Sequence, residues 1–404
     1  MNGKSREKEC PLCGAEEREI VFGQHFEPLG NASLMDGYDV AWCQGCGFVF
    51  AGGIPPSEEF SRYYADASKY EFSHSGGQQH AGEVKRLESL AEWIAAHCAT
   101  SARLIDIGCS TGELLVLLRA RGFTSLAGLD PSEACVRHGT QQHGLRLIRG
   151  VLATRPEATP LFDVLVLSAV LEHMPDLDRC VEQMRSWIEP EGLVVIEVPD
   201  AEMFDQGTNS PYQEFSVEHI NFFSAASLAN LMRKHGLSAV SERHYVCSVG
   251  SGMTVAGLTM MFRAGGDSEP PKKESASVAG VRRYLQKCEV WCQHENKVIQ
   301  ELIKSREAIL VWGTGTLCQR LLATTPFCDA NIVAFIDSNP HYQGRELHGR
   351  PILAPADVKR YGEPILIASW AFEDEIRDQI RNALGLGNRL ISLIPIDAAA
   401  GAGL

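Results

Sequence analysis

Hydrophobic residues are spaced in two different ways along the chain, and this spacing predicts alternating strands and helices. Short apolar runs, bounded by glycine or charged residues, predict strands at residues 103–108, 125–130, 145–150, 162–170 and 192–198. Ahead of them, Leu87, Leu90, Ala91 and Ile94 recur at helical spacing and predict an amphipathic helix. This alternation predicts an α/β fold.

A second set of strands follows a long helix in the last third of the chain. Residues 264–280 lack hydrophobic periodicity and are rich in glycine, serine, proline and charge, which is typical of a linker or exposed loop. After them, residues 281–307 predict one long helix, and three further apolar runs predict strands. The predicted parts are a loop-rich segment at 1–75, an α/β unit at 76–263, a linker at 264–280 and a second α/β unit at 281–404.

The composition excludes several classes of protein. The 404 residues are enough for two or three domains, and the net charge of −14 opposes general binding to nucleic-acid backbones. The sequence starts without an apolar signal-peptide core, and no apolar run is long enough to span a bilayer. Most of the 13 cysteines are scattered through apolar segments, as in a reducing compartment. We therefore expect a cytoplasmic protein with no nucleic-acid or membrane partner.

Four cysteines form two closely spaced pairs in the loop-rich segment. Cys10 and Cys13 are one pair, Cys43 and Cys46 are the other, and a glycine directly follows each pair. Four thiolates on tight turns are the ligand set of a closed tetrahedral zinc site. Because such a site leaves no coordination position for substrate or water, we expect a structural Zn²⁺ ion in a zinc-binding domain at 1–75. The alternative is four unrelated reduced cysteines.

The sequence DIGCSTG at residues 106–112 follows the first strand of the middle unit and precedes a helix. It resembles motif I of the class I S-adenosylmethionine-dependent methyltransferases. Glycines let the turn approach a ligand closely, and the first helix turn offers N–H groups to the cofactor's carboxylate. An acid at the end of the next strand can accept both ribose hydroxyls. The resemblance implies a Rossmann-like core that binds S-adenosylmethionine through Asp106, Gly108, Ser110, Gly112 and Asp130.

A glycine turn with a downstream acid is equally compatible with a dinucleotide site. Residues 162–200 favour the methyltransferase, because they resemble the fourth strand, the following helix and the fifth strand of that class. One departure is that Gly150-Val151-Leu152 stands where the class commonly has an acid that binds the adenine amino group. We therefore expect backbone contacts to the adenine at this position.

The order of two CxxC pairs, a methyltransferase core and a C-terminal α/β unit resembles that of the sugar C-methyltransferases, which act on nucleotide-linked deoxysugars. The resemblance covers nearly the whole chain and is carried by short motifs at residues 43–47, 61–64, 171–176, 218–224, 343–345 and 369–376. It implies that a base removes a proton beside a sugar ketone and that the enolate carbon then attacks the methyl group. It also implies a small-molecule acceptor, a nucleotide-sugar, and a role in natural-product biosynthesis.

The same motifs indicate three candidate catalytic residues. His219 is the candidate base because imidazole titrates near neutral pH, and Glu218 beside it can orient the ring. His173, which leaves the fourth strand, is expected to polarise the ketone, whereas the alternative for each histidine is a surface or capping role. The family's Tyr-His pair before Glu-His is replaced by Ser216-Val217, and the candidates for the missing tyrosine are Tyr63, Tyr64 and Tyr212.

The C-terminal unit has the outline of a dinucleotide fold, with Gly313-Thr314-Gly315 after a strand and Asp337 at the end of the next. Cys318 stands at the usual third glycine, so we expect a Rossmann-like domain that contacts the nucleotide-sugar rather than binding NAD tightly. Two rival functions remain for the whole chain. One is an O- or N-methyltransferase of similar layout that acts on a natural-product intermediate, and the other is a non-catalytic scaffold that binds zinc and a nucleotide. These patterns do not indicate an oligomeric state.

Overall fold

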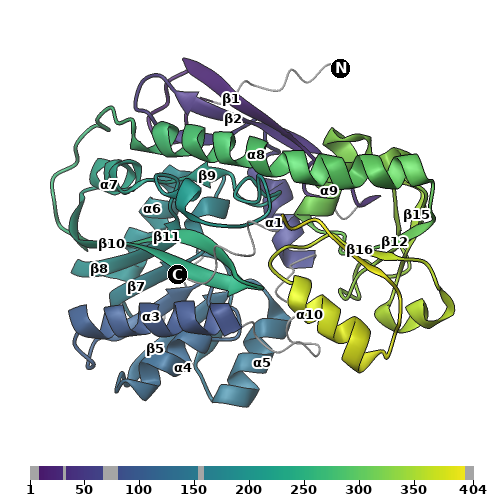
Figure 1. The fold of residues 1–404 in the computed structure, drawn as a ribbon. Helices are drawn as coiled ribbons and strands as arrows, with labels where there is room; N and C mark the ends of the chain where they lie inside the picture. The colour runs from purple at the N-terminus through teal and green to yellow at the C-terminus, as the bar shows by residue number, and fades with distance from the viewer. Residues whose placement is uncertain (1–8, 31–32, 67–80, 153–158, 396–404) are drawn as a thin grey trace.

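The computed structural model describes residues 9–30, 33–66, 81–152 and 159–395. Within these residues the strands form three sheets of four, seven and six strands (Figure 1). Among the same residues, no helix combines the length and the apolar character needed to cross a bilayer. The predicted boundary between residues 75 and 76 lies within 67–80, outside the described residues.

The N-terminal sheet is antiparallel and includes a strand from the middle of the chain. Its members, in spatial order, are β1 (Arg18–His25), β2 (Gly37–Cys43), β3 (Val49–Gly52) and β9 (Asn221–Phe222). Phe50 in β3 pairs with Asn221, and the Ala51 N–H donates to the Ile220 carbonyl at 2.8 Å. Helix α1 (Ser57–Asp66) follows β3. The segment that leads into β9 is therefore attached to the N-terminal sheet.

The middle sheet has the strand order β10-β11-β8-β7-β4-β5-β6. These strands are β4 (Arg103–Ile107), β5 (Ser125–Asp130), β6 (Leu147–Arg149), β7 (Phe162–Ser168), β8 (Ile188–Pro199), β10 (Leu237–Gly250) and β11 (Met253–Ala264). Strands β4 to β8 are parallel, so the predicted α/β fold is confirmed. The antiparallel β10–β11 hairpin was not predicted, because polar residues on exposed positions interrupt the apolar pattern of the edge strand β10.

Helices cover both faces of the middle sheet. Side chains alternate along β4, so Leu104 packs on one side with the helices α3 (Ala81–His97) and α4 (Glu113–Ala120). Ile105 packs on the other side with α6 (Leu177–Trp187) and α7 (Ala225–Lys234). Helix α5 (Glu133–His143) connects β5 to β6. Two apolar layers thus enclose the sheet and leave the carboxyl ends of its parallel strands for a ligand.

The C-terminal sheet has the order β14-β15-β13-β12-β16-β17. Its strands are β12 (Ile309–Trp312), β13 (Ile332–Ile336), β14 (Glu346–Leu347), β15 (Arg350–Leu353), β16 (Ile365–Ile367) and β17 (Leu390–Ser392). Helices α9 (Thr316–Thr324) and α10 (Glu373–Asp378) follow β12 and β16. Short helical turns lie at Leu171–His173, Phe204–Gln206, Pro326–Asp329, Pro355–Arg360 and Gln379–Ala383.

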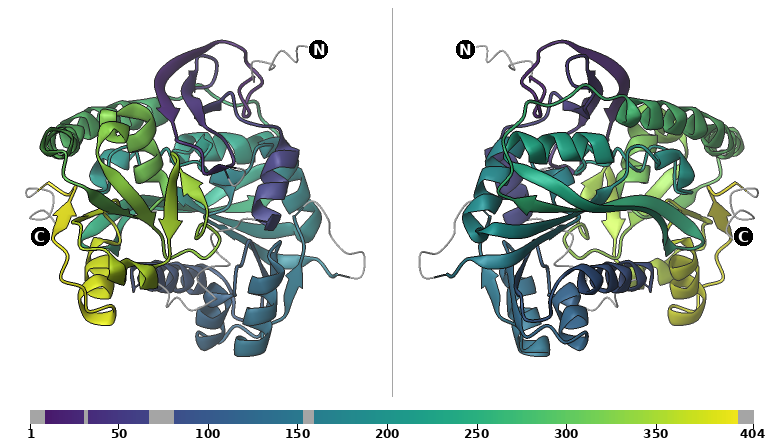
Figure 2. Two further views of the ribbon diagram at one scale, coloured as in Figure 1. Left: turned by 90° about the vertical axis from the view of Figure 1, so that its right-hand side faces the viewer. Right: turned by 90° about the vertical axis from the view of Figure 1, so that its left-hand side faces the viewer.

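Helix α8 (Ala276–Ser305) packs against two different parts of the molecule. Val281 and Tyr284, in its first half, belong to the apolar core under the N-terminal sheet, and Ile299, near its end, belongs to the core of the C-terminal sheet. Figure 2 shows the N-terminal strands above the other two sheets, with α8 crossing beside them. The helix starts within the segment 264–280 predicted as a linker, because the Glu274 carboxylate accepts the Ser277 N–H at 3.2 Å and so caps its first turn.

Candidate functional site

The glycine turn between β4 and α4 faces a large cleft. Gly108 has a φ of 73°, and a Cβ added there would lie 2.5 Å from Val170 Cγ2, so a larger residue would displace the wall of the cleft. The cleft encloses about 1360 Å³, and Asp106, Gly108 and Ser110 line it. Gly112, which has a φ of 88°, does not line the cleft; it lets the chain turn into α4.

Asp130, at the end of β5, braces this turn from the neighbouring strand. Its Oδ2 accepts the Ser110 N–H and its Oδ1 accepts the Ser132 N–H, both at 2.8 Å. The side chain is buried but lines the cleft. Each carboxylate oxygen can accept more than one hydrogen bond, so this carboxylate is positioned to hold the turn and also to accept ligand hydroxyls.

The surroundings of Asp106 favour a cationic ligand. Burial, together with the charges of Asp130 and Glu113, raises the pKa of Asp106 well above its ordinary value. A positively charged ligand group beside the carboxyl would favour its ionised form again. Gly150-Val151-Leu152, where an adenine contact was expected through the backbone, line the same cleft next to Asp130.

The three predicted catalytic residues come together on another wall of the cleft. His173 belongs to the short helical turn after β7, whereas Glu218 and His219 come just before β9. The ring centroids of His173 and His219 are 5.0 Å apart, and His173 Nδ1 lies 3.0 Å from the Glu218 carbonyl oxygen. Of the candidate tyrosines, Tyr63 donates its hydroxyl to Glu218 Oε1 at 2.9 Å, whereas Tyr212 stacks on Phe22.

The hydrogen bonds of His173 restrict what the ring can do. A carbonyl oxygen only accepts, so Nδ1 carries the proton in the contact with Glu218, and Nε2 of a neutral ring carries the lone pair. Nε2 lies 3.8 Å from Glu172 Oε1. His173 can therefore donate a hydrogen bond from Nε2 to a ligand oxygen only as an imidazolium.

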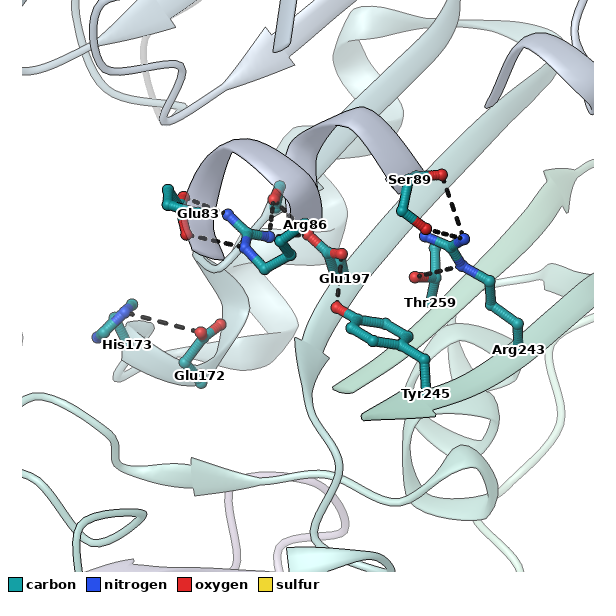
Figure 3. Close-up of polar contacts among 10 residues, drawn as sticks. Glu83, Arg86, Ser89, Glu172, His173, Glu197, Arg243, Tyr245 and Thr259 are labelled. Carbon is teal, nitrogen blue, oxygen red and sulfur yellow. Dashed lines mark hydrogen bonds and ion pairs between the residues drawn. The ribbon is translucent and has the colours of Figure 1, made fainter. Parts of the chain in front are cut away.

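An ionic network that the sequence analysis missed lies at the carboxyl ends of β7 and β8 (Figure 3). Arg86 of α3 forms an ion pair with Glu197 and donates to Ser168 Oγ at 2.9 Å. Tyr245 of β10 donates its hydroxyl to Glu197 Oε1 at 2.6 Å. Glu83, one turn before Arg86, binds the same guanidinium. All five residues line the cleft, so the network forms part of its wall.

Glu197 is buried at the centre of the network, Arg86 and Tyr245 are partly buried, and the charges depend on one another. The carboxylates of Glu197 and Glu83 overcome the effect of burial and raise the pKa of Arg86 well above its ordinary value. Burial and the Glu197 charge raise the pKa of Tyr245 well above the ordinary value too. Arg86 is therefore a permanent cation and Tyr245 a neutral donor. The sequence signal for this site was Glu197, an acid inside the apolar run 193–198 of β8.

The carboxyl ends of strands in the C-terminal sheet face the same cleft. Asp337, after β13, accepts the Thr314 N–H at 2.9 Å on Oδ2 and the Asn339 N–H at 2.8 Å on Oδ1. This geometry repeats that of Asp130. Cys318 is fully buried in α9, away from the cleft, so the position of the usual third glycine is a packing position here. Trp370 and Gly313 complete this wall.

Comparison with known proteins identifies the chemistry of the middle unit. Residues 79–242 match a family model described as a methyltransferase domain. Over 96% of its length the chain is 23% identical to the C-methyltransferase NovU of Streptomyces niveus, and 95% of that protein is covered. The chain is an S-adenosylmethionine-dependent methyltransferase. S-Adenosylmethionine is accordingly the methyl donor.

Further matches to the methyltransferase are partial. A probable S-adenosylmethionine-dependent methyltransferase of Mycolicibacterium smegmatis is 28% identical over 38% of this chain and 58% of its own. Residues 305–391 of the enzyme match a second family model, described as C2185-like, N-terminal. The crystal structure of magnesium protoporphyrin IX methyltransferase from Synechocystis PCC 6803, with bound S-adenosylmethionine, aligns with a TM-score of 0.39 at 15% identity and covers 53% of this chain and 99% of its own.

The four paired cysteines of the methyltransferase converge on one point of the N-terminal sheet. The Sγ atoms of Cys10 and Cys46 are 3.7 Å apart, and those of Cys13 and Cys43 are 3.5 Å apart. A tetrahedral ion with zinc–sulfur bonds of about 2.3 Å would hold its sulfur atoms about 3.8 Å apart. The donor set and its spacing therefore fit zinc. The turn at Cys46 also accepts the Glu274 N–H at 3.0 Å, ahead of α8.

A second group of possible metal donors overlaps the catalytic candidates of the enzyme. Single donor atoms of Glu172, His173 and His219 lie within 4.8 Å of one another. Both histidines and the carboxylate line the cleft. This grouping brings a carboxylate and two imidazoles to one place, and groups this close are equally suited to exchange protons.

Proposed function

We propose that the enzyme methylates a carbon atom of a nucleotide-linked keto-deoxysugar through an enolate. One observation carries the proposal: a single cleft is lined by the glycine turn, by the His173–His219 pair and by the edge of the C-terminal sheet. The similarity to a C-methyltransferase over 96% of the chain supports carbon as the acceptor atom. The size of the cleft, about 1360 Å³, suits a cofactor and a nucleotide-sugar together.

In this proposal the middle unit holds the methyl donor. The turn at Gly108 and Ser110 lies beside the methionine part, Asp106 faces its ammonium group, and Asp130 accepts the ribose hydroxyls. S-Adenosylmethionine supplies an electrophilic methyl group on a sulfonium. The nucleotide part of the acceptor lies along the C-terminal edge near Asp337 and Trp370, which places the sugar between the two units.

His219 is the proposed general base. Its imidazole takes the proton from the carbon beside the ketone, and the electron pair of that C–H bond forms the enolate. The new carbon–carbon bond forms as the methyl–sulfur bond breaks, and the ketone is restored. Glu218, held by the Tyr63 hydroxyl, positions the segment that carries His219. His173 as an imidazolium, paired with Glu172, donates to the enolate oxygen.

A structural Zn²⁺ ion bound by Cys10, Cys13, Cys43 and Cys46 belongs to the same proposal. The sulfur spacing supports it, and four protein ligands leave the ion no position for catalysis. The ion would hold the two knuckle turns together beside β3.

The rival function is O- or N-methylation, which can use the same base. A hydrogen-exchange experiment separates the two. The enzyme is incubated in deuterated water with S-adenosylhomocysteine and a thymidine-diphosphate-linked keto-deoxysugar, and the sugar protons are followed by NMR. Carbon methylation predicts loss of the proton beside the ketone with wild type and retention with His219→Asn. Turnover of an acceptor without any such exchange would establish heteroatom transfer.

A further inference from the structure

Glu214 is a buried acid in the wall of the cleft, and the roles assigned above do not use it. It lies four residues before Glu218, in the segment between the helical turn Phe204–Gln206 and β9. The residue is 6% exposed, and it lines the cleft together with Gln213. The Glu214 N–H donates to the Tyr284 hydroxyl oxygen at 3.2 Å, which anchors the backbone of this residue to α8.

The carboxyl group of Glu214 has no partner among the described residues. There, no hydrogen bond reaches either of its oxygens, and no arginine, lysine or histidine lies within ion-pair distance of it. The unpaired carboxyl oxygens of Glu214 are not among the polar atoms that are fully enclosed by protein. At least part of the carboxyl group is therefore open to the cleft. A buried polar group that the protein leaves unpaired but open to a ligand space is suited to bind the ligand.

Burial favours the neutral form of Glu214. Burial alone raises its pKa to about 7. The titratable groups that interact with it are Tyr284 from α8 and Cys247 from β10. Burial raises the pKa of Cys247 to about 11 and that of Tyr284 well above its ordinary value, so both are uncharged at neutral pH. Slightly below neutral pH the acid is therefore protonated and offers one O–H donor.

We propose that Glu214 binds the methyl acceptor as a neutral carboxylic acid and donates a hydrogen bond to one of its oxygen atoms. The donor needs an acceptor, and Glu214 lines the cleft in which the methyl acceptor would bind. A keto-deoxysugar carries a carbonyl oxygen and hydroxyl oxygens that can accept this hydrogen bond. The choice of this class of acceptor rests on the proposed function. Glu214 is thus a specificity-determining residue that favours oxygen-rich acceptors.

Three variants test this contact. Glu214→Gln keeps a donor but cannot ionise, Glu214→Ala removes the donor, and Glu202→Gln removes an acid that does not line the cleft. The affinity for a thymidine-diphosphate-linked keto-deoxysugar is measured calorimetrically with S-adenosylhomocysteine present. At pH 6 we expect about tenfold weaker binding for Glu214→Ala and at most about threefold for the two glutamine variants. Wild-type affinity should fall as the pH rises through about 7, whereas Glu214→Gln should lack that decrease.

An infrared measurement on the free enzyme tests the protonation state without any acceptor. The wild-type minus Glu214→Gln difference spectrum at pH 6 should contain the carbonyl stretch of a neutral carboxylic acid, and this band should vanish at pH 9. A missing band, an alanine variant with unchanged affinity, or a glutamine variant as weak as alanine would each overturn the inference. Failure of the wild type to bind any nucleotide-linked keto-deoxysugar would instead overturn the proposed substrate, and the infrared band would still decide the state of Glu214.

Discussion

Two aspartates with the same local geometry allow the cofactor site to be tested against an internal control. Asp130 accepts the N–H groups of Ser110 and Ser132, and Asp337 accepts those of Thr314 and Asn339, all at 2.8 or 2.9 Å. Replacing either aspartate by alanine removes the brace of one glycine turn. Only Asp130 is assigned to the ribose of S-adenosylmethionine, so both variants should lose stability but only Asp130→Ala should lose cofactor affinity.

The expected size of the difference follows from the bonds that are lost. A hydrogen bond to a charged group contributes about 1.5 to 3 kcal/mol net, so loss of the ribose contact should weaken cofactor binding roughly 10- to 150-fold in Asp130→Ala. The turn beside it also loses two backbone contacts, which lowers the free energy of unfolding. Asp337→Ala loses two corresponding backbone contacts and also the Thr314 hydroxyl, which donates to Oδ2 at 2.6 Å, and should keep its cofactor affinity.

Calorimetric titration with S-adenosylhomocysteine measures the affinity, and thermal unfolding of the same samples measures the stability. A dissociation constant for Asp130→Ala within about threefold of the wild-type value would refute the ribose assignment. Equal losses of affinity in the two variants would show that general loosening of the fold, rather than the ribose contact, accounts for the effect.

Three further predictions concern the base, the metal and the buried acid. His219→Asn should lower turnover roughly 10²- to 10⁴-fold with unchanged cofactor affinity, and His173→Asn should do likewise if its melting curve matches that of wild type. Elemental analysis should find one zinc ion per chain, and Cys43→Ser should lose both the ion and thermal stability. Because the pKa of Glu214 rises from 4.5 to about 7 on folding, the unfolded chain holds fewer protons between these values. Denaturant titrations should therefore show wild type losing up to about 3 kcal/mol relative to Glu214→Gln as the pH rises through that window.

The parts of the site that could be predicted are those written in short stretches of sequence. The glycine turn and Asp130 are close in the chain, and each cysteine pair spans four residues. Arg86, Glu197 and Tyr245 could not be grouped in this way, because they come from one helix and two strands that meet only after the sheet forms. Glu214 has no local motif at all. Its role depends on what surrounds it, which a single sequence does not contain.

The pairing of β3 with β9 limits how this enzyme can be recombined with its relatives. The segment that carries His219 is attached through β9 to a strand that begins three residues after Cys46. A chimera that takes its first 66 residues from another parent would join a foreign β3 to the native β9. Such a graft could fold and still misplace the base. Exchanges intended to broaden the range of acceptors should therefore take both strands from one parent, although 168 residues separate them in the chain.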